Sequence, residues 1–281
     1  MNARIIIFGA NGCLAKHISE NLNEEGYNLK KISRKNFDYI NNNNKLFNVV
    51  KKFKPRIIIN CAAMSELDKC RVDPKKAYEI NTIFPYKLGI LSKTINAVLI
   101  HFSTDAVFDG KKKTIYKIND KALPDTVYGQ SKIAGEKLID FYDKSIIIRL
   151  PLLYGKYHKK QIIGVLLDKL KKGKKIFASK DVYSTPVNSE DVAIFIKKNI
   201  SRAKINKLLK KKIIHLSSNK RVSIYNFMKK ISFIIGKPKN VVAVKDSFFN
   251  KKYNKPKNLG LRANVDSFKG SKLYKFVYDY K

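Results

Sequence analysis

Short apolar runs alternate with amphipathic segments along the first half of the chain. The runs are rich in Ile and Val and lie at residues 4–9, 28–34, 56–63, 97–104 and 145–155. Segments of helical length separate them, at about residues 12–25, 44–53, 74–94 and 128–142. Near-continuous apolar strands are typical of a parallel sheet that helices cover on both faces. The pattern therefore predicts an α/β protein with a doubly wound parallel sheet of the Rossmann type.

The alternation loosens after residue 155. It predicts helices at 162–172, 189–200 and 223–236 and strands at 175–179 and 213–218. We expect residues 1–155 to form a Rossmann domain, to which a segment at about 188–218 returns. Residues 156–187 and 219–281 are expected to form a smaller, C-terminal substrate-binding lobe.

The composition limits the classes of function. The chain has 281 residues and a formal net charge of +37, from 59 Lys and Arg against 22 Asp and Glu. The basic residues are mostly Lys and are spread along the chain, whereas bidentate reading of bases or phosphates favours Arg. We therefore expect no specific binding of nucleic acid, although the charge favours anionic substrates such as nucleotide-linked metabolites.

The chain also lacks the signals of membrane, secreted and metal-binding proteins. No run of about 18 apolar residues predicts a membrane span, and the N-terminus enters a strand pattern at once, without room for a signal peptide. The three cysteines, Cys13, Cys61 and Cys70, have neither the number nor the spacing of a disulfide framework or zinc site. A cytoplasmic protein without a bound metal is expected.

A glycine-containing turn follows the first apolar run. Gly9 and Gly12 lie between a strand and a helix, as in a dinucleotide-binding turn, and Ala15 takes the place of a third glycine. Gly9 would permit the tight turn, and Gly12 would let a pyrophosphate approach the free N–H groups at the helix N-terminus. An ordinary strand-to-helix turn containing Asn-Gly is the alternative.

Ser33 and Arg34 stand at the end of the second predicted strand. NAD-binding sites usually hold the ribose 2′-hydroxyl with a carboxylate at this place, whereas Arg suits a 2′-phosphate. No acid occupies residues 33–35, so NADP(H) is expected in preference to NAD(H). A basic strand end in a basic protein is the alternative.

Tyr128 precedes Lys132 by four residues at the start of a predicted helix, so both side chains share one face. A phenol with a pKa of about 10 needs a neighbouring ammonium group to work as an acid–base catalyst at neutral pH. Ser103 and Thr104 end the fourth strand, at the edge where open α/β sheets bind ligands. Thr104 could hold a substrate oxygen that Tyr128 protonates as hydride arrives. Lys also follows Tyr27, Tyr225 and Tyr253 by four residues, but none of these pairs has this setting.

These residues and several sequence blocks resemble the extended short-chain dehydrogenase/reductases, and within them the dTDP-4-dehydrorhamnose reductase family. The blocks are "GANGCLA", "RIIINCAAMSELDKC", "YEIN", "HFSTDAVFDG", "TVYGQSKIAGEKLI", "DVYSTPVNSEDVA" and "KPKNLGL". The resemblance implies a catalytic triad of Thr104, Tyr128 and Lys132. It also implies that Tyr128 and Lys132 contact the cofactor. The further cofactor contacts that it implies are Gly9, Asn11, Gly12, Leu14, Ala62, Ala63, Asn81 and Ser103.

The same resemblance implies the reaction, which is NADPH-dependent reduction of the 4-keto group of a nucleotide-linked deoxysugar. The sugar is expected to be dTDP-linked and to serve cell-surface polysaccharide synthesis. Candidates for substrate contacts are Asp105, Pro186, Lys257 and Asn258, and a homodimer is a further expectation.

Two alternatives remain open at this point. Nucleotide-sugar dehydratases usually follow the Thr with Asp-Glu, but Thr104 is followed by Asp105 and Ala106, which favours reduction over elimination. A nucleotide-sugar epimerase is disfavoured only mildly, by Ser33 and Arg34. The stretch "RLPLLYG" (149–155) resembles the regulatory β subunit of methionine adenosyltransferase, so a non-catalytic NADP-binding subunit is the second alternative.

Overall fold

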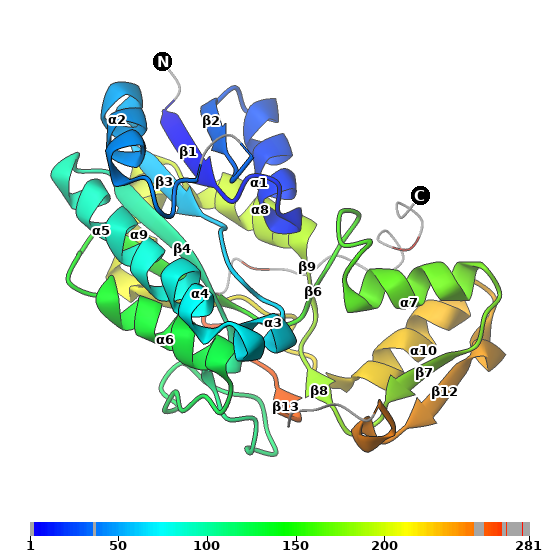
Figure 1. Ribbon diagram of the computed structural model, residues 1–281. Helices are drawn as coiled ribbons and strands as arrows, with labels where there is room; N and C mark the ends of the chain where they lie inside the picture. The colour runs from blue at the N-terminus through cyan, green and yellow to red at the C-terminus, as the bar shows by residue number, and fades with distance from the viewer. Residues whose placement is uncertain (1–2, 36–37, 250–255, 266–267, 269–276, 278–281) are drawn as a thin grey trace.

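A computed structural model describes residues 3–35, 38–249 and 256–265, together with residues 268 and 277. Its centre is a six-stranded parallel sheet in the order β10-β5-β4-β3-β1-β2 (Figure 1). The strands are β1 (Arg4–Phe8), β2 (Asn28–Ile32), β3 (Ile57–Asn60), β4 (Val98–Thr104), β5 (Ser145–Leu150) and β10 (Ile213–His215). The predicted doubly wound fold is confirmed, and the five apolar runs supply five of the six strands.

Helices cover both faces of this sheet (Figure 1). One face carries α1 (Cys13–Glu24), α8 (Ser189–Asn199) and α9 (Arg202–Lys211). The other carries α2 (Asn43–Phe53), α5 (Phe84–Thr94) and α6 (Val127–Leu138). The Ile residues of β1 alternate between the two cores, Ile5 and Ile7 on one side and Ile6 on the other, and all are 0% exposed. Each such side chain contributes about 1.5–3 kcal/mol through burial, which is why the runs are apolar at every position.

The predicted helix at 74–94 is instead three consecutive helical segments, preceded by the short helix α3 (Leu67–Val72). They are α4 (Pro74–Tyr78), a π-helical turn at Glu79–Ile83, and α5. A π-helical turn adds a residue to the helical repeat and is frequent at functional sites. Here it places Asn81, which is 0% exposed, against α6.

A second, smaller core lies beside the sheet and is built from later parts of the chain. It contains α7 (Ile162–Lys171), α10 (Ile224–Ile234) and the strand pair β7 (Ile176–Ser179) and β12 (Val241–Val244). Short strands form two further small sheets, one of β6 (Leu153–Tyr154) with β9 (Val187–Asn188), and one of β8 (Tyr183–Ser184) with β11 (Val222–Ser223) and β13 (Asn258–Leu259). Among the described residues, 3₁₀ turns lie at Asp105–Val107, Pro238–Asn240 and Asp246–Phe249.

We propose the two cores as two units, a Rossmann domain and a substrate-binding lobe. In this division α8, α9 and β10 are the segment that returns to the Rossmann domain. His17 on α1 and Glu190 on α8 tie this segment down, with 2.6 Å between Nδ1 and Oε2, and Val265 also packs into the first core. The parts of the lobe at 250–255, 266–267, 269–276 and 278–281 lie outside the described residues.

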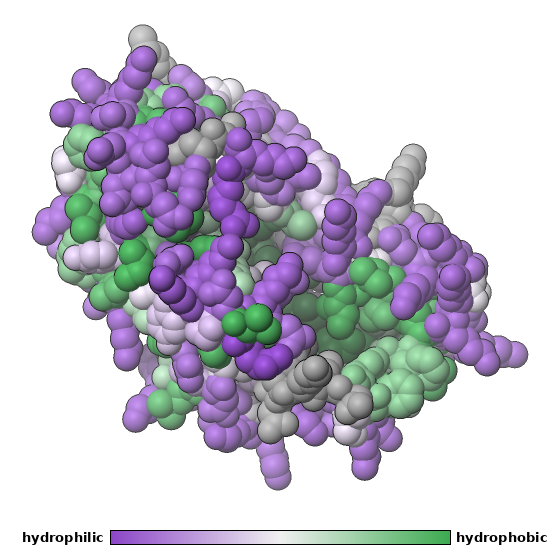
Figure 2. Space-filling view, in the orientation of Figure 1, coloured by the Kyte–Doolittle hydropathy of each residue, from purple (hydrophilic) through white to green (hydrophobic). Residues whose placement is uncertain are grey.

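The face of the molecule shown in Figure 2 is mostly hydrophilic, as the high charge leads us to expect. Figure 2 shows hydrophilic side chains over most of one face, with hydrophobic ones gathered near α7, β7 and β12. Among the described residues, no helix combines the length and the hydropathy needed to cross a membrane. The part of the chain that the structure describes also holds no group of three or more His, Cys, Asp or Glu side chains placed to bind a metal ion.

Candidate active site

The turn between β1 and α1 is suited to a pyrophosphate. Gly9 has a φ of 74°, and a Cβ atom there would lie 2.6 Å from the backbone nitrogen of Ala62, so no larger residue fits. Gly12 precedes α1, whose first turn has no side-chain cap and no acidic residue. The backbone N–H groups of this turn are therefore available to an anion. Asn11 is exposed beside them, whereas the side chain of Leu14 is buried in the core, so Leu14 offers only its backbone.

The end of β2 carries the cationic side chain of Arg34, and the carboxylate of Asp38 in the loop that follows is already hydrogen-bonded. Ser33 is buried and Arg34 is exposed. The nearest acid among the described residues is Asp38, whose carboxylate accepts hydrogen bonds from the side chain of Asn41 and the backbone of Ile40. The Asn41 bond, together with the positive charge of Arg34, lowers the pKa of Asp38. The end of β2 therefore exposes two cationic side chains, Arg34 and Lys35.

Asn81 holds the loop after β3 in place. Its side chain accepts from the backbone N–H of Met64 and donates to the Met64 carbonyl, both over 2.9 Å, and it also donates to Ser131 Oγ on α6 over 3.0 Å. These bonds fix Met64, which directly follows Ala62 and Ala63 in the loop. Ala62 is buried and Ala63 is exposed. The sequence blocks suggested a cofactor contact here but not this clamp.

Thr104 and Tyr128 meet at the carboxyl end of β4. The Thr104 side chain is a hydrogen-bonding neighbour of the Tyr128 phenol and by itself lowers the pKa of that phenol. Thr104 Oγ1 also lies 3.2 Å from Asp105 Oδ1 and accepts from the backbone N–H of Ala106. Burial raises the pKa of Tyr128, and the negative charge of Asp105 adds to this effect. The raised pKa keeps Tyr128 a neutral phenol at neutral pH.

Lys132 lies one turn further along α6 and is 1% exposed. Its Nζ is 2.7 Å from the Phe102 carbonyl oxygen and 3.1 Å from His101 Nε2. Burial lowers the pKa of Lys132 to about 8, against the opposing charge of Glu136. Within the described part of the chain, no hydrogen bond joins Lys132 to Tyr128. The expected support of a phenolate by this ammonium group is thus not a direct contact here, and the roles of the three residues stay predictions.

A buried ion pair lies next to the end of β4. Arg149 Nη2 lies 2.7 Å from Glu136 Oε2, and both side chains are at most 5% exposed. The Ser103 hydroxyl also donates to the Glu136 carboxylate, so Ser103 is directed toward this pair. Glu136 was not among the predicted site residues, although its position four residues after Lys132 on one helix face could have indicated it.

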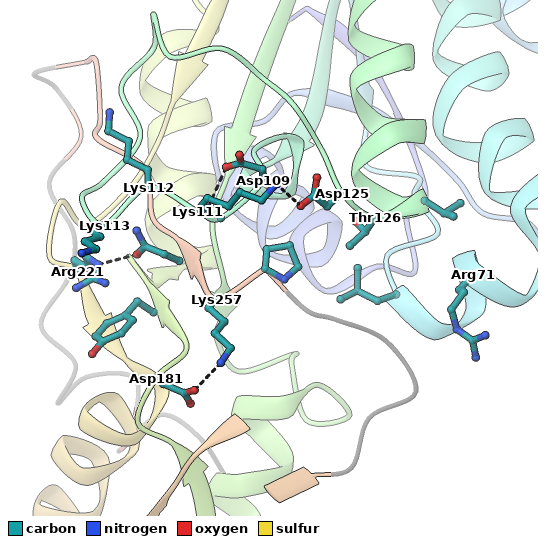
Figure 3. A pocket seen from close by; sticks show the side chains of 16 residues that line it. Arg71, Asp109, Lys111, Lys112, Lys113, Asp125, Thr126, Asp181, Arg221 and Lys257 are labelled. Atoms are coloured by element: carbon teal, nitrogen blue, oxygen red, sulfur yellow. Dashed lines mark hydrogen bonds and ion pairs between the residues drawn. The ribbon is translucent and has the colours of Figure 1, made fainter. Parts of the chain in front are cut away.

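A cavity of about 810 Å³ lies against the start of α6, although Tyr128 itself is not among its described lining residues. Its wall includes Thr126 and Val127, which precede Tyr128 on α6 (Figure 3). Cationic side chains dominate its charged lining, which consists of Arg71, Lys111, Lys112, Lys113, Arg221 and Lys257 against Asp109, Asp125 and Asp181. The cavity therefore has the charge and size for a ligand that carries phosphate groups.

Two of the four predicted substrate contacts line this cavity. Lys257 Nζ lies 3.0 Å from Asp181, and Asn258 accepts from Arg221 Nε over 2.7 Å (Figure 3). The guanidinium of Arg221 also stacks on Tyr183, 3.6 Å from the ring centre. Asp105 and Pro186 are buried and are not among the described lining residues. Arg221 and Tyr183 were not predicted, since only the fold brings them to Asn258.

Of the other Tyr–Lys pairs in the sequence, the one that begins at Tyr253 lies partly outside the described residues.

The parallel sheet, the glycine turn and the Thr–Tyr–Lys group together define an extended short-chain dehydrogenase/reductase. Within that class, the chain belongs to the family described as RmlD substrate binding domain, whose profile matches residues 3–273.

Individual relatives agree with this placement. The dTDP-4-dehydrorhamnose reductase of Aggregatibacter actinomycetemcomitans is 32% identical over 228 residues, which are 80% of this chain and 76% of that protein. A crystal structure of dTDP-4-dehydrorhamnose reductase from Bacillus anthracis, in complex with NADP, is 29% identical and has a TM-score of 0.87, covering 100% of this chain and 99% of the other. The β subunit of methionine adenosyltransferase 2 from Pongo abelii is 26% identical over 235 residues, 80% of this chain and 70% of that one.

Proposed function

We propose that this protein is a reductase that transfers hydride from NADPH to the 4-keto carbon of a dTDP-linked 4-dehydro-deoxysugar, as in dTDP-4-dehydrorhamnose. The observation that carries the proposal is the pairing of Thr104 with Tyr128 at the end of β4, next to a helix start that lines a cationic cavity. The similar reductases, which align along most of their length, support the same reaction.

Each residue has a defined task in this reaction. NADPH, when bound, supplies the hydride. Thr104 donates a hydrogen bond to the 4-keto oxygen, and Tyr128 transfers its phenolic proton to that oxygen as the carbon is reduced. The proton that Tyr128 loses is replaced from solvent. Lys132 lies one turn away on the same helix face, where its ammonium form holds the cofactor ribose and favours the phenolate.

NADPH is proposed in preference to NADH because of the end of β2. Arg34 is exposed there, and the nearby Asp38 carboxylate is engaged with Asn41. A 2′-phosphate would gain a charge-assisted hydrogen bond from Arg34, whereas a 2′-hydroxyl would find no free acid among residues 33–35. The relative from Bacillus anthracis is described in complex with NADP.

The cavity at the start of α6 is proposed as the place of the nucleotide sugar. Its lysine and arginine side chains would neutralise a diphosphate, and Arg221 with Tyr183 offers a flat surface to a base or sugar. The expected cytoplasmic location and the expected homodimer stay predictions.

The alternative of a non-catalytic regulatory subunit is supported less well. The relative of that kind from Pongo abelii is 26% identical, against 32% for the reductase of Aggregatibacter actinomycetemcomitans, and this chain has Thr104, Tyr128 and Lys132 near the carboxyl end of β4. An epimerase is the remaining alternative, and it differs from a reductase because it consumes no external reductant.

The test is oxidation of NADPH by the purified protein with dTDP-4-dehydrorhamnose. A reductase consumes NADPH in step with the sugar, and NADH supports a lower kcat/KM. Conversion of the sugar without NADPH consumption would contradict the proposal in favour of an epimerase. Tight NADPH binding without any conversion, together with altered kinetics of a co-purifying enzyme, would favour the regulatory subunit.

A further inference from the structure

Three buried side chains, Asn60, His101 and Lys132, form a hydrogen-bonded chain across β3, β4 and α6. Each of them is at most 1% exposed. His101 is in the middle, with Nδ1 3.0 Å from Asn60 Nδ2 and Nε2 3.1 Å from Lys132 Nζ. Because the chain is shut off from solvent, each proton on it must match the donor or acceptor that faces it.

The backbone of Ala62 fixes the direction of the Asn60 amide. The N–H of Ala62 donates to Asn60 Oδ1 over 3.0 Å, so the NH₂ group is the part that faces His101. An amide NH₂ group only donates, and a neutral imidazole has one protonated and one accepting nitrogen. Burial keeps the pKa of His101 well below 6.5, so the ring is neutral. Nδ1 is therefore the acceptor, and the single ring proton lies on Nε2, toward Lys132.

This tautomer opposes a charged Lys132. An ammonium group has three donors and no acceptor, so it would face the Nε2–H of His101 donor to donor. An uncharged amine can accept from Nε2–H while it donates to the Phe102 carbonyl, 2.7 Å away. A charged Lys132 needs the His101 proton on Nδ1. Asn60 must then turn its oxygen to His101, which brings the NH₂ group against the N–H of Ala62.

We propose that His101 and Lys132 titrate as one unit, in which His101 moves its ring proton between Nε2 and Nδ1 whenever Lys132 loses or gains its charge. Asn60 opposes the charged form through its bond to Ala62. His101 and Asn60 are positioning residues in this arrangement, because they act on the reaction only through Lys132.

Burial and the neighbouring ionisable groups set the pH of this exchange. Burial lowers the pKa of Lys132 to about 8, while Glu136 on α6 and Cys61 after β3 act in the opposite direction. Arg149 on β5 is paired with Glu136 and offsets part of its charge. The consequence for catalysis rests on the proposed function: above this pH, Lys132 loses the charge that would hold the ribose and favour the Tyr128 phenolate.

The direct test is a pH titration of the whole chain labelled with [¹⁵N]histidine, because ¹⁵N NMR distinguishes the two neutral tautomers. The chain has four histidines, and loss of one signal set in His101→Gln identifies His101. We expect the Nδ1–H form at neutral pH, the Nε2–H form above about pH 9, and a midpoint near the lysine titration. Lys132→Met should abolish the exchange and leave Nε2–H. One tautomer at every pH in the wild type, or an exchange that persists in Lys132→Met, would overturn the proposal.

A second variant tests the part played by Asn60. Asn60→Asp places an oxygen toward both Ala62 and His101, so it should raise the midpoint by about one pH unit or more. Asn188→Asp is the control, since it changes a buried amide that caps α8, on the other core; its midpoint should match the wild type. The high-pH limb of kcat/KM should move with the NMR midpoint. Exchange without turnover would refute the proposed function but not this inference, and an unmoved midpoint in Asn60→Asp would refute the role of Asn60.

Discussion

The two sides of the candidate active site are built in different ways. On the Rossmann side, Asn81, Lys132 and Glu136 are buried, and each has several partners within the protein. On the cavity side, the charges are carried by exposed lysines such as Lys111 and Lys257, in ion pairs that solvent reaches. Exposed pairs contribute little to stability, whereas breaking a buried pair is costly. Substitutions on the Rossmann side are therefore expected to affect both activity and stability. Substitutions on the cavity side are expected to affect substrate binding without unfolding the protein.

The largest effect is expected on kcat, when the proton donor on the Rossmann side is removed without a change in the fold. Tyr128→Phe deletes the proton donor and should lower kcat by about 10²- to 10⁴-fold, with the fold preserved. Tyr142→Phe is the matched control: it removes a buried hydroxyl that donates to Ala97, so it should cost about 1 kcal/mol of unfolding free energy and leave kcat unchanged. Steady-state kinetics and denaturant unfolding measure the two effects; equal kcat values in the two variants would exclude Tyr128 as the acid.

The next effect is expected on stability. Glu136→Gln leaves Arg149 charged and unpaired in the interior, which should lower the free energy of unfolding by about 3–5 kcal/mol. Glu66→Gln is the control, because the exposed pair of Glu66 with Lys69 should contribute nothing measurable. Urea unfolding compares them, and a Glu136→Gln protein as stable as the control would remove the distinction between the two sides.

Acid should destabilise the protein through its buried histidines. Burial lowers the pKa of both His158 and His215 to about 4, so the folded state resists protons that the unfolded state accepts below pH 6.5. The stability is then complete above that pH and falls between pH 6.5 and 4, by up to about 1.4 kcal/mol per pH unit for each group. Glu190, whose pKa the His17 hydrogen bond lowers to about 2, adds a further loss below pH 4.5. A Tm that stays constant from pH 7 to 4.5 would contradict this account.

The smallest effect is expected at the cavity wall. Arg221→Ala removes a cation that stacks on Tyr183 and donates to Asn258, and it should raise KM for the nucleotide sugar about tenfold, equivalent to roughly 1.4 kcal/mol. The kcat and the Tm should change little. A variant with unchanged KM and a lowered Tm would instead place Arg221 among the structural residues.

The same contrast explains what the sequence alone could predict. Strands β1, β3 and β5 are buried on both faces, so each appears in the sequence as a continuous run of Ile residues from which the strand could be predicted. The glycine turn and the Tyr128–Lys132 spacing are local patterns and were found for that reason. The π-helical turn at Asn81 was missed, because it depends on packing against α6 rather than on local spacing.

The cavity wall was predicted only in part for a different physical reason. It joins residues 109–113, Tyr183, Arg221 and Asn258, which are far apart in sequence and have no periodic pattern. Lys257 and Asn258 were found through a family resemblance, but their partners Asp181 and Arg221 were not. The contacts of His101 with Asn60 and Lys132 were hidden in the same way, since they cross three elements.

In the proposed reaction, the 4-keto group of a nucleotide sugar receives hydride from NADPH and a proton from Tyr128. The most direct measurement uses NADPH deuterated at the transferable position, with dTDP-4-dehydrorhamnose, and locates the label in the product by NMR. The account predicts one deuterium on C4 of the sugar with wild-type protein, formed about 10²- to 10⁴-fold more slowly with Tyr128→Phe. Product with no label on C4, or labelling at the same rate in both proteins, would contradict it.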